Sequence, residues 1–134
     1  MRYLGIDYGD KKIGLALGDS ETRVAVPLEV IQNTDVVYQT IADLIKSEAI
    51  DQVVVGVPLS TTEGPGSPQL EKTRQFIKEL RHFVSISIDE EDERYTTAES
   101  IRLQREESAG AEEDALAAML ILQAYLDQKR SGRL

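Results

Sequence analysis

The first thirty residues contain three short apolar runs that are typical of β-strands. The runs cover 2–7, which ends on Asp7, then 12–18, which alternates strictly between apolar and other positions, and about 24–30. Pro27 lies within the third run, and because proline has no backbone N–H to donate, this run is predicted to be an edge strand. Only short turns separate the runs, so we expect an antiparallel meander.

After residue 33 the apolar residues adopt the three- and four-residue spacing of helices, interrupted by short strand-like runs. The run 53–57 is continuously apolar, as expected of a central parallel strand covered on both faces. The run 84–88 alternates as a strand and leads into the acidic stretch 89–93, of which residues 89–91 are expected in a solvated loop. The predicted helices are one to about residue 48 capped by Asn33 or Thr34, one over 68–81, one to about 107 capped by Thr96 or Thr97, and one over 111–129.

This order of elements predicts an α/β fold built on one five-stranded mixed sheet with helices on both faces. The first three strands are expected to pair antiparallel, and the later two are expected to add parallel strands. No linker or repeat divides the chain, so we expect a single domain over 1–134. Right-handed crossovers would bring the strand ends that carry Asp7, Gly56 and residues 92–93 to one rim of the sheet.

Composition narrows the chemistry that this fold could carry. The net charge of −9, from 15 basic and 24 acidic residues, lowers the expectation of nucleic-acid binding, because Lys and Arg supply much of that affinity. Divalent cations bound by carboxylates would reverse the local sign, so nucleic acid stays a candidate partner. The absence of cysteine excludes disulfides, thiol nucleophiles and zinc ribbons. With no signal-peptide pattern and no apolar run near the roughly 20 residues that span a bilayer, we expect a cytoplasmic protein without membrane contact.

The segment 5–16 carries the first candidate site residue. Asp7 ends an apolar strand, Gly9 permits a tight turn, and Gly14 allows a close approach to the second strand. An aspartate there presents two hard oxygens that suit Mg²⁺ or Mn²⁺. The alternative is that Asp7 only caps a hairpin turn, as aspartate often does. Both glycines and the two flanking strands favour the metal-binding interpretation.

The second candidate is Asp92 or Glu93, between a predicted strand and the start of a helix. Neighbouring residues on an extended chain face opposite ways, so only one of the two is expected to reach a metal at the rim. The other would pair with Arg94 or cap the helix. The pattern of residues alone leaves both open.

The third candidate is Asp114, in the segment 111–118. The helix macrodipole favours acids in a first helical turn and accounts for Glu112 and Glu113. Asp114 fits that account less well, because apolar residues follow it at once and its face is expected to be half buried. A buried charge needs a partner, and a metal ion is one possibility.

The sequence also suggests roles for other polar residues. His82, the only histidine, is expected on the surface in a turn between a helix and a strand and is not a candidate base. The residues expected to contact the phosphates of a nucleic acid are Lys11, Lys12, Arg94, Arg102 and Arg105. Thr96 and Thr97 are further expected nucleic-acid contacts.

These motifs, in their order and spacing, resemble those of the YqgF/RuvX family. The matching segments are 5–9 with 14–16, then 55–59, 92–99 and 114–118. The resemblance implies an RNase H-like fold and a Holliday-junction-resolvase-like nuclease that processes the 5′ end of pre-16S rRNA. It spans essentially the whole chain, and two departures stand out: the acids 89–91 replace an apolar strand end, and Tyr95 stands where the family often has Leu.

The resemblance also implies roles for particular residues. It maps the catalytic and metal-binding acids onto Asp7, Glu93 and Asp114, with Asp7 bridging two Mg²⁺ or Mn²⁺ ions during phosphodiester hydrolysis. The intervening acids 89–91 leave Asp92 in competition with Glu93. Pre-rRNA is the expected partner and branched DNA an alternative one, and the protein would be a monomer or a homodimer.

Two rival functions come from other classes. The pattern Asp-x-Gly-x₄-Gly-x-Ala also resembles the first phosphate loop of actin-like ATPases and sugar kinases, which need a second similar domain that this length does not supply. A non-catalytic ribosome-assembly factor would keep the fold and bind RNA without cutting it. ATP-dependent stabilisation would support the first rival, and RNA binding that survives loss of all three acids would support the second.

Overall fold

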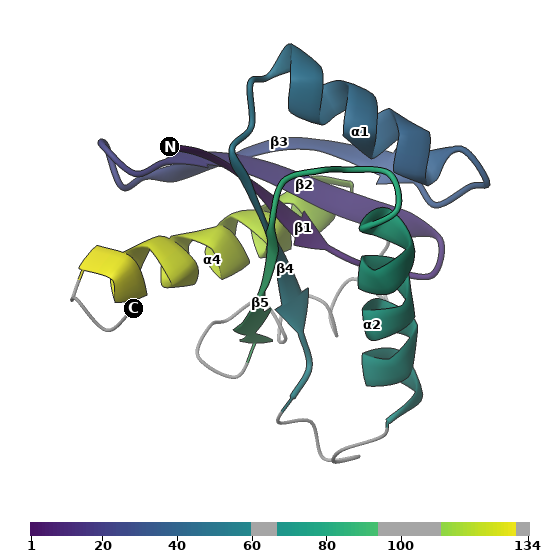
Figure 1. Ribbon diagram of the computed structural model, residues 1–134. Helices are drawn as coiled ribbons and strands as arrows, with labels where there is room; N and C mark the ends of the chain where they lie inside the picture. The colour runs from purple at the N-terminus through teal and green to yellow at the C-terminus, as the bar shows by residue number, and fades with distance from the viewer. Residues whose placement is uncertain (60–66, 94–110, 131–134) are drawn as a thin grey trace.

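The computed structural model describes residues 1–59, 67–93 and 111–130 and contains a single twisted sheet with helices on both of its faces (Figure 1). The predicted helix after Thr96 or Thr97 lies outside the described residues. The strands are β1 (Arg2–Asp7), β2 (Lys12–Asp19), β3 (Ala25–Gln32), β4 (Gln52–Val57) and β5 (Ile88–Asp92). The helices are α1 (Val37–Ser47), α2 (Pro68–Leu80) and α4 (Ala111–Arg130).

The strand order β3-β2-β1-β4-β5 confirms the predicted mixed five-stranded sheet. β1, β2 and β3 pair antiparallel, whereas β4 runs parallel to both β1 and β5. β3 lies at an edge, as Pro27 predicted. Pro27 pairs with Ala16 and Glu29 pairs with Leu15, so Leu28 is an extra residue that forms a bulge in this edge strand.

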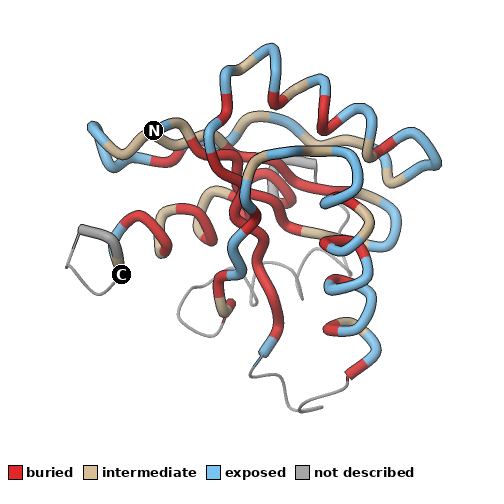
Figure 2. The backbone as a smooth tube through the Cα atoms, viewed as in Figure 1, coloured by how far each residue is buried: buried red, intermediate tan, exposed pale blue. Residues whose placement is uncertain are grey.

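Alternate residues of the central strands build two separate cores, one on each face of the sheet. On one face Leu4, Ile6 and Val55 pack with α1 and α2, and on the other Tyr3 and Val54 pack with α4. All six residues of β4 are buried, which confirms a central strand covered on both faces. Figure 2 shows the buried central strands between the helices, with exposed outer faces on α1 and α2 and mostly buried or intermediate positions on α4.

Helix α4 lies close to the sheet because the strands beneath it carry small residues. Its Leu122 is fully buried, and a Cβ on Gly5 would lie 2.8 Å from the Leu122 Cβ. A Cβ on Gly18 would lie 2.9 Å from the Leu122 Cδ2. The expectation that this helix packs deeply is therefore confirmed. No helix in the described part of the chain has both the length and the apolar composition required to cross a membrane.

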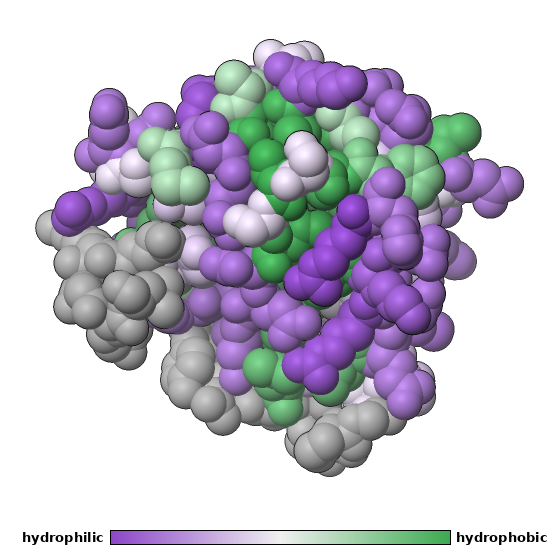
Figure 3. Space-filling model, viewed as in Figure 1, coloured by the Kyte–Doolittle hydropathy of each residue, from purple (hydrophilic) through white to green (hydrophobic). Residues whose placement is uncertain are grey.

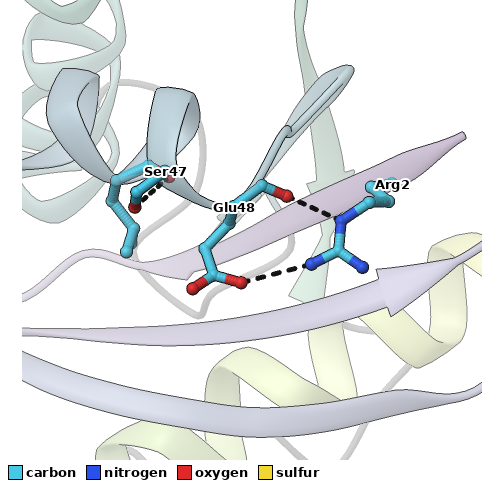
Figure 4. Close-up of polar contacts among 4 residues, drawn as sticks. Arg2, Ser47 and Glu48 are labelled. Atoms are coloured by element: carbon cyan, nitrogen blue, oxygen red, sulfur yellow. Dashed lines mark hydrogen bonds and ion pairs between the residues drawn. The ribbon is translucent and has the colours of Figure 1, made fainter.

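Helix α1 begins later than predicted and does not use the predicted caps. Val36 is its N-cap and makes no side-chain cap hydrogen bond, whereas Asn33 donates instead to the carbonyl oxygen of Gly9 at 2.9 Å. The end of α1 is attached to β1, because the Arg2 guanidinium donates to the Glu48 carbonyl oxygen at 2.6 Å and to its carboxylate at 3.2 Å (Figure 4). These half-exposed groups contribute orientation more than stability.

The acidic stretch 89–91 does not form the predicted loop. Strand β5 begins at Ile88, later than the predicted run 84–88, and its residues from Asp89 to Asp92 pair in register with β4. Backbone pairing with a buried neighbour satisfies the main chain whatever the side chains are, so the acids are accommodated on the two faces of an edge strand. Glu90 takes hydrogen bonds from Arg74 on α2, at 3.1 and 3.3 Å.

The space-filling view shows how this face of the molecule is divided (Figure 3). Hydrophobic side chains gather in its centre, between α1 and α2, and hydrophilic side chains surround them. Independently of this view, a chain of ring contacts runs from Tyr8 through Phe76 and Tyr38 to Phe83, with centroid separations of 4.8, 5.6 and 5.3 Å. These contacts join the end of β1 to both helices of this layer.

Truncation of Leu122 to Ala is expected to lower the free energy of unfolding by about 2–5 kcal/mol, because the side chain is fully buried between α4 and the sheet. Urea denaturation measures this change. Leu116→Ala on the same helix is the matched control, and with 37% of Leu116 exposed it should cost well under half as much. Equal losses in the two variants would contradict this packing of α4.

Candidate functional site

Asp7 ends β1 on the face of the sheet that α4 covers. Tyr3 and Gly5, which alternate with it along β1, both contact α4, so the Asp7 side chain is directed to the same face. Its exposed fraction is only 1%. The expectation that Asp7 stands at the end of the first strand is therefore confirmed, and the carboxylate is buried as well.

A glycine flanks Asp7 on each side. Gly14 of β2 is its direct partner in the antiparallel ladder, and Gly56 of β4 follows Val55, the partner of Ile6 in the parallel ladder. A Cβ on Gly14 would lie 1.9 Å from the carbonyl oxygen of Asp114, so the first turn of α4 rests directly on β2. The absence of a side chain at Gly14 is thus a condition for this placement of α4.

Gly56, on the other side of Asp7, likewise allows other side chains to approach the sheet closely. A Cβ there would lie 2.4 Å from Ile121 Cδ1 and 3.0 Å from the carboxylate oxygen Oε1 of Glu93. The Glu93 side chain therefore lies over Gly56, on the face that α4 covers. Asp7 stands between two glycines, with Asp114 above one and Glu93 above the other.

The alternation of β5 separates Glu93 from Asp92. Glu91 pairs with Gly56 on the α4 face, whereas Asp92 pairs with Val57, whose side chain belongs to the core under α1 and α2. Asp92 therefore faces away from Asp7, while Glu93, two positions after Glu91, faces toward it. Glu93 is also completely buried, in contrast to the intermediate exposure of Asp92.

The structure thus brings Asp7, Glu93 and Asp114 to one rim and one face of the sheet. Their exposed fractions are 1%, 0% and 2%, and three carboxylates so deeply buried require compensation by donors or cations. The donor set consists of hard oxygens, which fit Mg²⁺ or Mn²⁺ better than a soft metal. Within the described residues, no three acidic, histidine or cysteine side chains are already grouped tightly enough to hold a metal ion. The three acids therefore lie at the same rim, but their side chains do not form a complete coordination shell for a metal ion.

The turn that follows Asp7 is held by residues that sequence reasoning did not assign to the site. Asn33 donates to the Gly9 carbonyl oxygen, and Lys72 of α2 pairs with Asp10 at 3.3 Å. Both contacts join segments far apart in the chain, so no local pattern reveals them. They restrain the turn between β1 and β2 from two sides.

The predicted nucleic-acid contacts are only partly within the described residues. Lys11 is exposed in the turn after Asp7, and Lys12 begins β2 in the same alternation as Gly14. His82 is exposed in the turn after α2, as predicted. The other predicted contacts lie outside the described residues; they are Arg94, Thr96, Thr97, Arg102 and Arg105.

Solved structures define the class of this fold. RuvC of Thermus thermophilus in complex with a Holliday junction substrate aligns with a TM-score of 0.62 at 15% identity, covering 98% of this chain and 97% of that chain. The Fowlpox virus resolvase with its Holliday junction DNA aligns with a TM-score of 0.58 at 14% identity, covering 96% and 99%. At such low identity the likeness shows the fold alone, which is the RNase H-like fold of the resolvases.

Sequence relatives give the family. The model of the RuvX family, described as Holliday junction resolvase, matches residues 1–128. A relative from Sulfurihydrogenibium sp. (strain YO3AOP1), named "Putative pre-16S rRNA nuclease", is 40% identical over 132 residues that cover 95% of this chain and 90% of the relative. A relative of the same name from Desulforudis audaxviator is 37% identical and covers 99% of both chains. The chain belongs to the RuvX family, and this membership places it among phosphodiester-hydrolysing enzymes.

Replacement of Gly14 by Ala is expected to destabilise the protein by about 3 kcal/mol or more, because the new methyl group meets backbone atoms of Asp114 that have little freedom to move. The matched control is Gly18→Ala on the same face of β2. There the atoms nearest to the new methyl group belong to the Leu122 and Leu126 side chains and not to the backbone, and we expect a loss of about 1 kcal/mol. Chemical denaturation compares the two, and a larger loss at Gly18 would contradict the close contact at Gly14.

Proposed function

We propose that this protein is a divalent-metal-dependent nuclease that removes the 5′ extension of the 16S rRNA precursor. The observation that carries the proposal is the placement of Asp7, Glu93 and Asp114 at one rim, around the two glycines that flank Asp7. The substrate is inferred from the relatives named for pre-16S rRNA, which match almost the whole chain.

Each of the three acids would contribute ligands to the metal ions. Asp7, the central acid, would contribute to two metal positions, and Glu93 and Asp114 would each complete one. When bound, such ions lower the pKa of a water molecule and offset the negative charge that develops on the attacked phosphate. Burial of all three carboxylates keeps competing water away from the metal positions and strengthens electrostatic interactions there.

Charge explains why metal would be required for binding as well as for cleavage. The protein has a net charge of −9, and its site adds three carboxylates that repel a polyanion. Divalent cations at these carboxylates would reverse the local sign. Lys11 and Lys12, in the turn that follows Asp7 and at the start of β2, would then contact the phosphate backbone.

Histidine has no role in this mechanism. His82 lies in the turn before β5, at the end of the sheet opposite to the carboxyl ends of β1 and β4. The proton released by the attacking water therefore passes to a carboxylate or to solvent. Metal-assisted hydrolysis is the reaction class that accommodates such a site.

Cleavage of branched DNA is the second candidate, because the matching family model is described as Holliday junction resolvase. A synthetic four-way DNA junction offered beside the rRNA precursor distinguishes the two substrates. Faster cleavage of the junction would favour resolvase activity. RNA binding that persists without cleavage in Mg²⁺ or Mn²⁺ would instead favour a non-catalytic assembly factor.

The Asp7→Asn variant should lose at least about 100-fold in cleavage rate on a 5′-extended 16S rRNA precursor, because the central metal-binding carboxylate becomes a neutral amide. The matched control is Asp10→Asn, an exposed acid in the following turn that pairs with Lys72. That variant should stay within about threefold of wild type, since exposed pairs contribute little. Undiminished metal-dependent cleavage by Asp7→Asn would refute the assignment.

A second pair of variants tests the choice between the two neighbouring acids. Glu93→Gln should reduce cleavage by about 100-fold, because Glu93 lies over Gly56 on the same face as Asp7. Asp92→Asn should change it by no more than about threefold, because Asp92 pairs with Val57 and faces the opposite core. The reverse ranking in single-turnover assays would assign the metal to Asp92.

A further inference from the structure

Strand β5 carries acids on its α4 face beyond the one that the proposed reaction uses. Asp89 and Glu91 share this face with Glu93, because they occupy alternate positions along the strand. Both accept hydrogen bonds from α4. The Tyr125 hydroxyl donates to Asp89 Oδ2 at 2.5 Å, and the Gln128 amide donates to Glu91 Oε2.

These bonds add directionality to the α4 contact on the β5 side of the sheet. Under α4 the sheet presents Gly5, Gly14 and Gly18, and the helix presents small and aliphatic side chains such as Ala117 and Ala118. Such packing is non-directional, so it resists separation better than it resists sliding or rotation. A hydrogen bond depends on both distance and angle, so the two bonds to β5 restrict these motions.

The same two elements also place two of the proposed metal-binding acids at the rim. Asp114 lies in the first turn of α4, and Glu93 directly follows β5. A helix rises 1.5 Å per residue, so the eleven steps from Asp114 to Tyr125 cover about 16.5 Å along one continuous helix. A shift of α4 at Tyr125 is therefore transmitted to Asp114.

We propose that Tyr125 and Gln128 are positioning residues that set the place of Asp114 relative to Glu93 by tying α4 to β5. The inference rests on the proposed function, since it assigns these residues a purpose in the metal site. They act through the helix and do not contact the substrate.

Two further observations support this role. Burial, followed by the hydrogen bond to Asp89, raises the pKa of Tyr125 far above its usual value, so its hydroxyl remains a donor throughout the physiological pH range. On the opposite edge of the sheet, Gln123 accepts from the Ala25 amide and donates to the Arg23 carbonyl oxygen, both at 2.9 Å. That second attachment still holds α4 against the β3 edge of the sheet when the Tyr125 hydroxyl is removed, so the variant is expected to fold while α4 becomes free to shift on the β5 side.

The test compares Tyr125→Phe with Tyr3→Phe, its matched control. The two rings contact each other in the same core, at a centroid distance of 5.8 Å, but only the Tyr125 hydroxyl bonds to β5. Calorimetric titration with MnCl₂ in the absence of substrate should show about tenfold weaker binding for Tyr125→Phe. Cleavage should show a similar fall in kcat with KM within twofold of wild type, and Tyr3→Phe should leave all three quantities within twofold.

A rescue experiment separates positioning from general loss of stability. Gln128→Glu sets two carboxylates against each other and should weaken Mn²⁺ binding, whereas adding Glu91→Gln restores a donor and an acceptor with the charges exchanged and should recover it to within about threefold. Equal Mn²⁺ binding by Tyr125→Phe and Tyr3→Phe, or no recovery in the double variant, would overturn the positioning role alone. A wild-type protein that neither binds Mn²⁺ nor cleaves would overturn the proposed function, and this inference with it.

Discussion

The contact between the first turn of α4 and Gly14 is the constraint on which the rest of the site depends. Only a residue without a side chain at this position lets the Asp114 backbone rest on β2, directly beside the ladder partner of Asp7. Gly5 and Gly18 continue the same close approach along the helix. Asp114 is therefore placed at the rim because Gly14 has no side chain, and not because the acids attract one another.

Burial of like charges is the cost of this arrangement. Asp7, Glu93 and Asp114 are almost inaccessible to solvent, and buried carboxylates destabilise the fold unless cations or donors compensate them. Glu91 on β5 shows how a donor can do so, since this buried carboxylate accepts a hydrogen bond from the Gln128 amide. At the rim, the proposed function gives the compensating role to divalent metal ions. Stability and metal binding are then linked, because ligands that bind only the folded state stabilise it.

Much of the fold was predictable because the spacing of apolar residues along the chain indicates which side chains are buried. The alternation of 12–18, the continuous run 53–57 and the position of Pro27 each indicated a strand of the correct kind, and together they gave the mixed sheet. Asp7 was predictable for the same reason, since it ends such a strand. The family membership confirms the resemblance carried by the spacing of the motifs.

Other features were not predictable, because they depend on partners distant in sequence. The acids 89–91 look like a solvated loop until the pairing of β5 with β4 is known. That pairing also distinguishes Asp92 from Glu93, since the register decides which one shares a face with Asp7. Asn33 resembles a helix cap but holds the turn at Gly9, a contact that exists only after β3 has folded against β2.

The central claim is that Asp7, Glu93 and Asp114 form one metal site on the α4 face of the sheet. The most direct measurement is anomalous diffraction from crystals soaked in MnCl₂. Anomalous density is expected at the rim, in contact with the Asp7 carboxylate and with at least one of Glu93 and Asp114. Density at Asp92 on the opposite face, or none at these carboxylates at millimolar Mn²⁺, would contradict it.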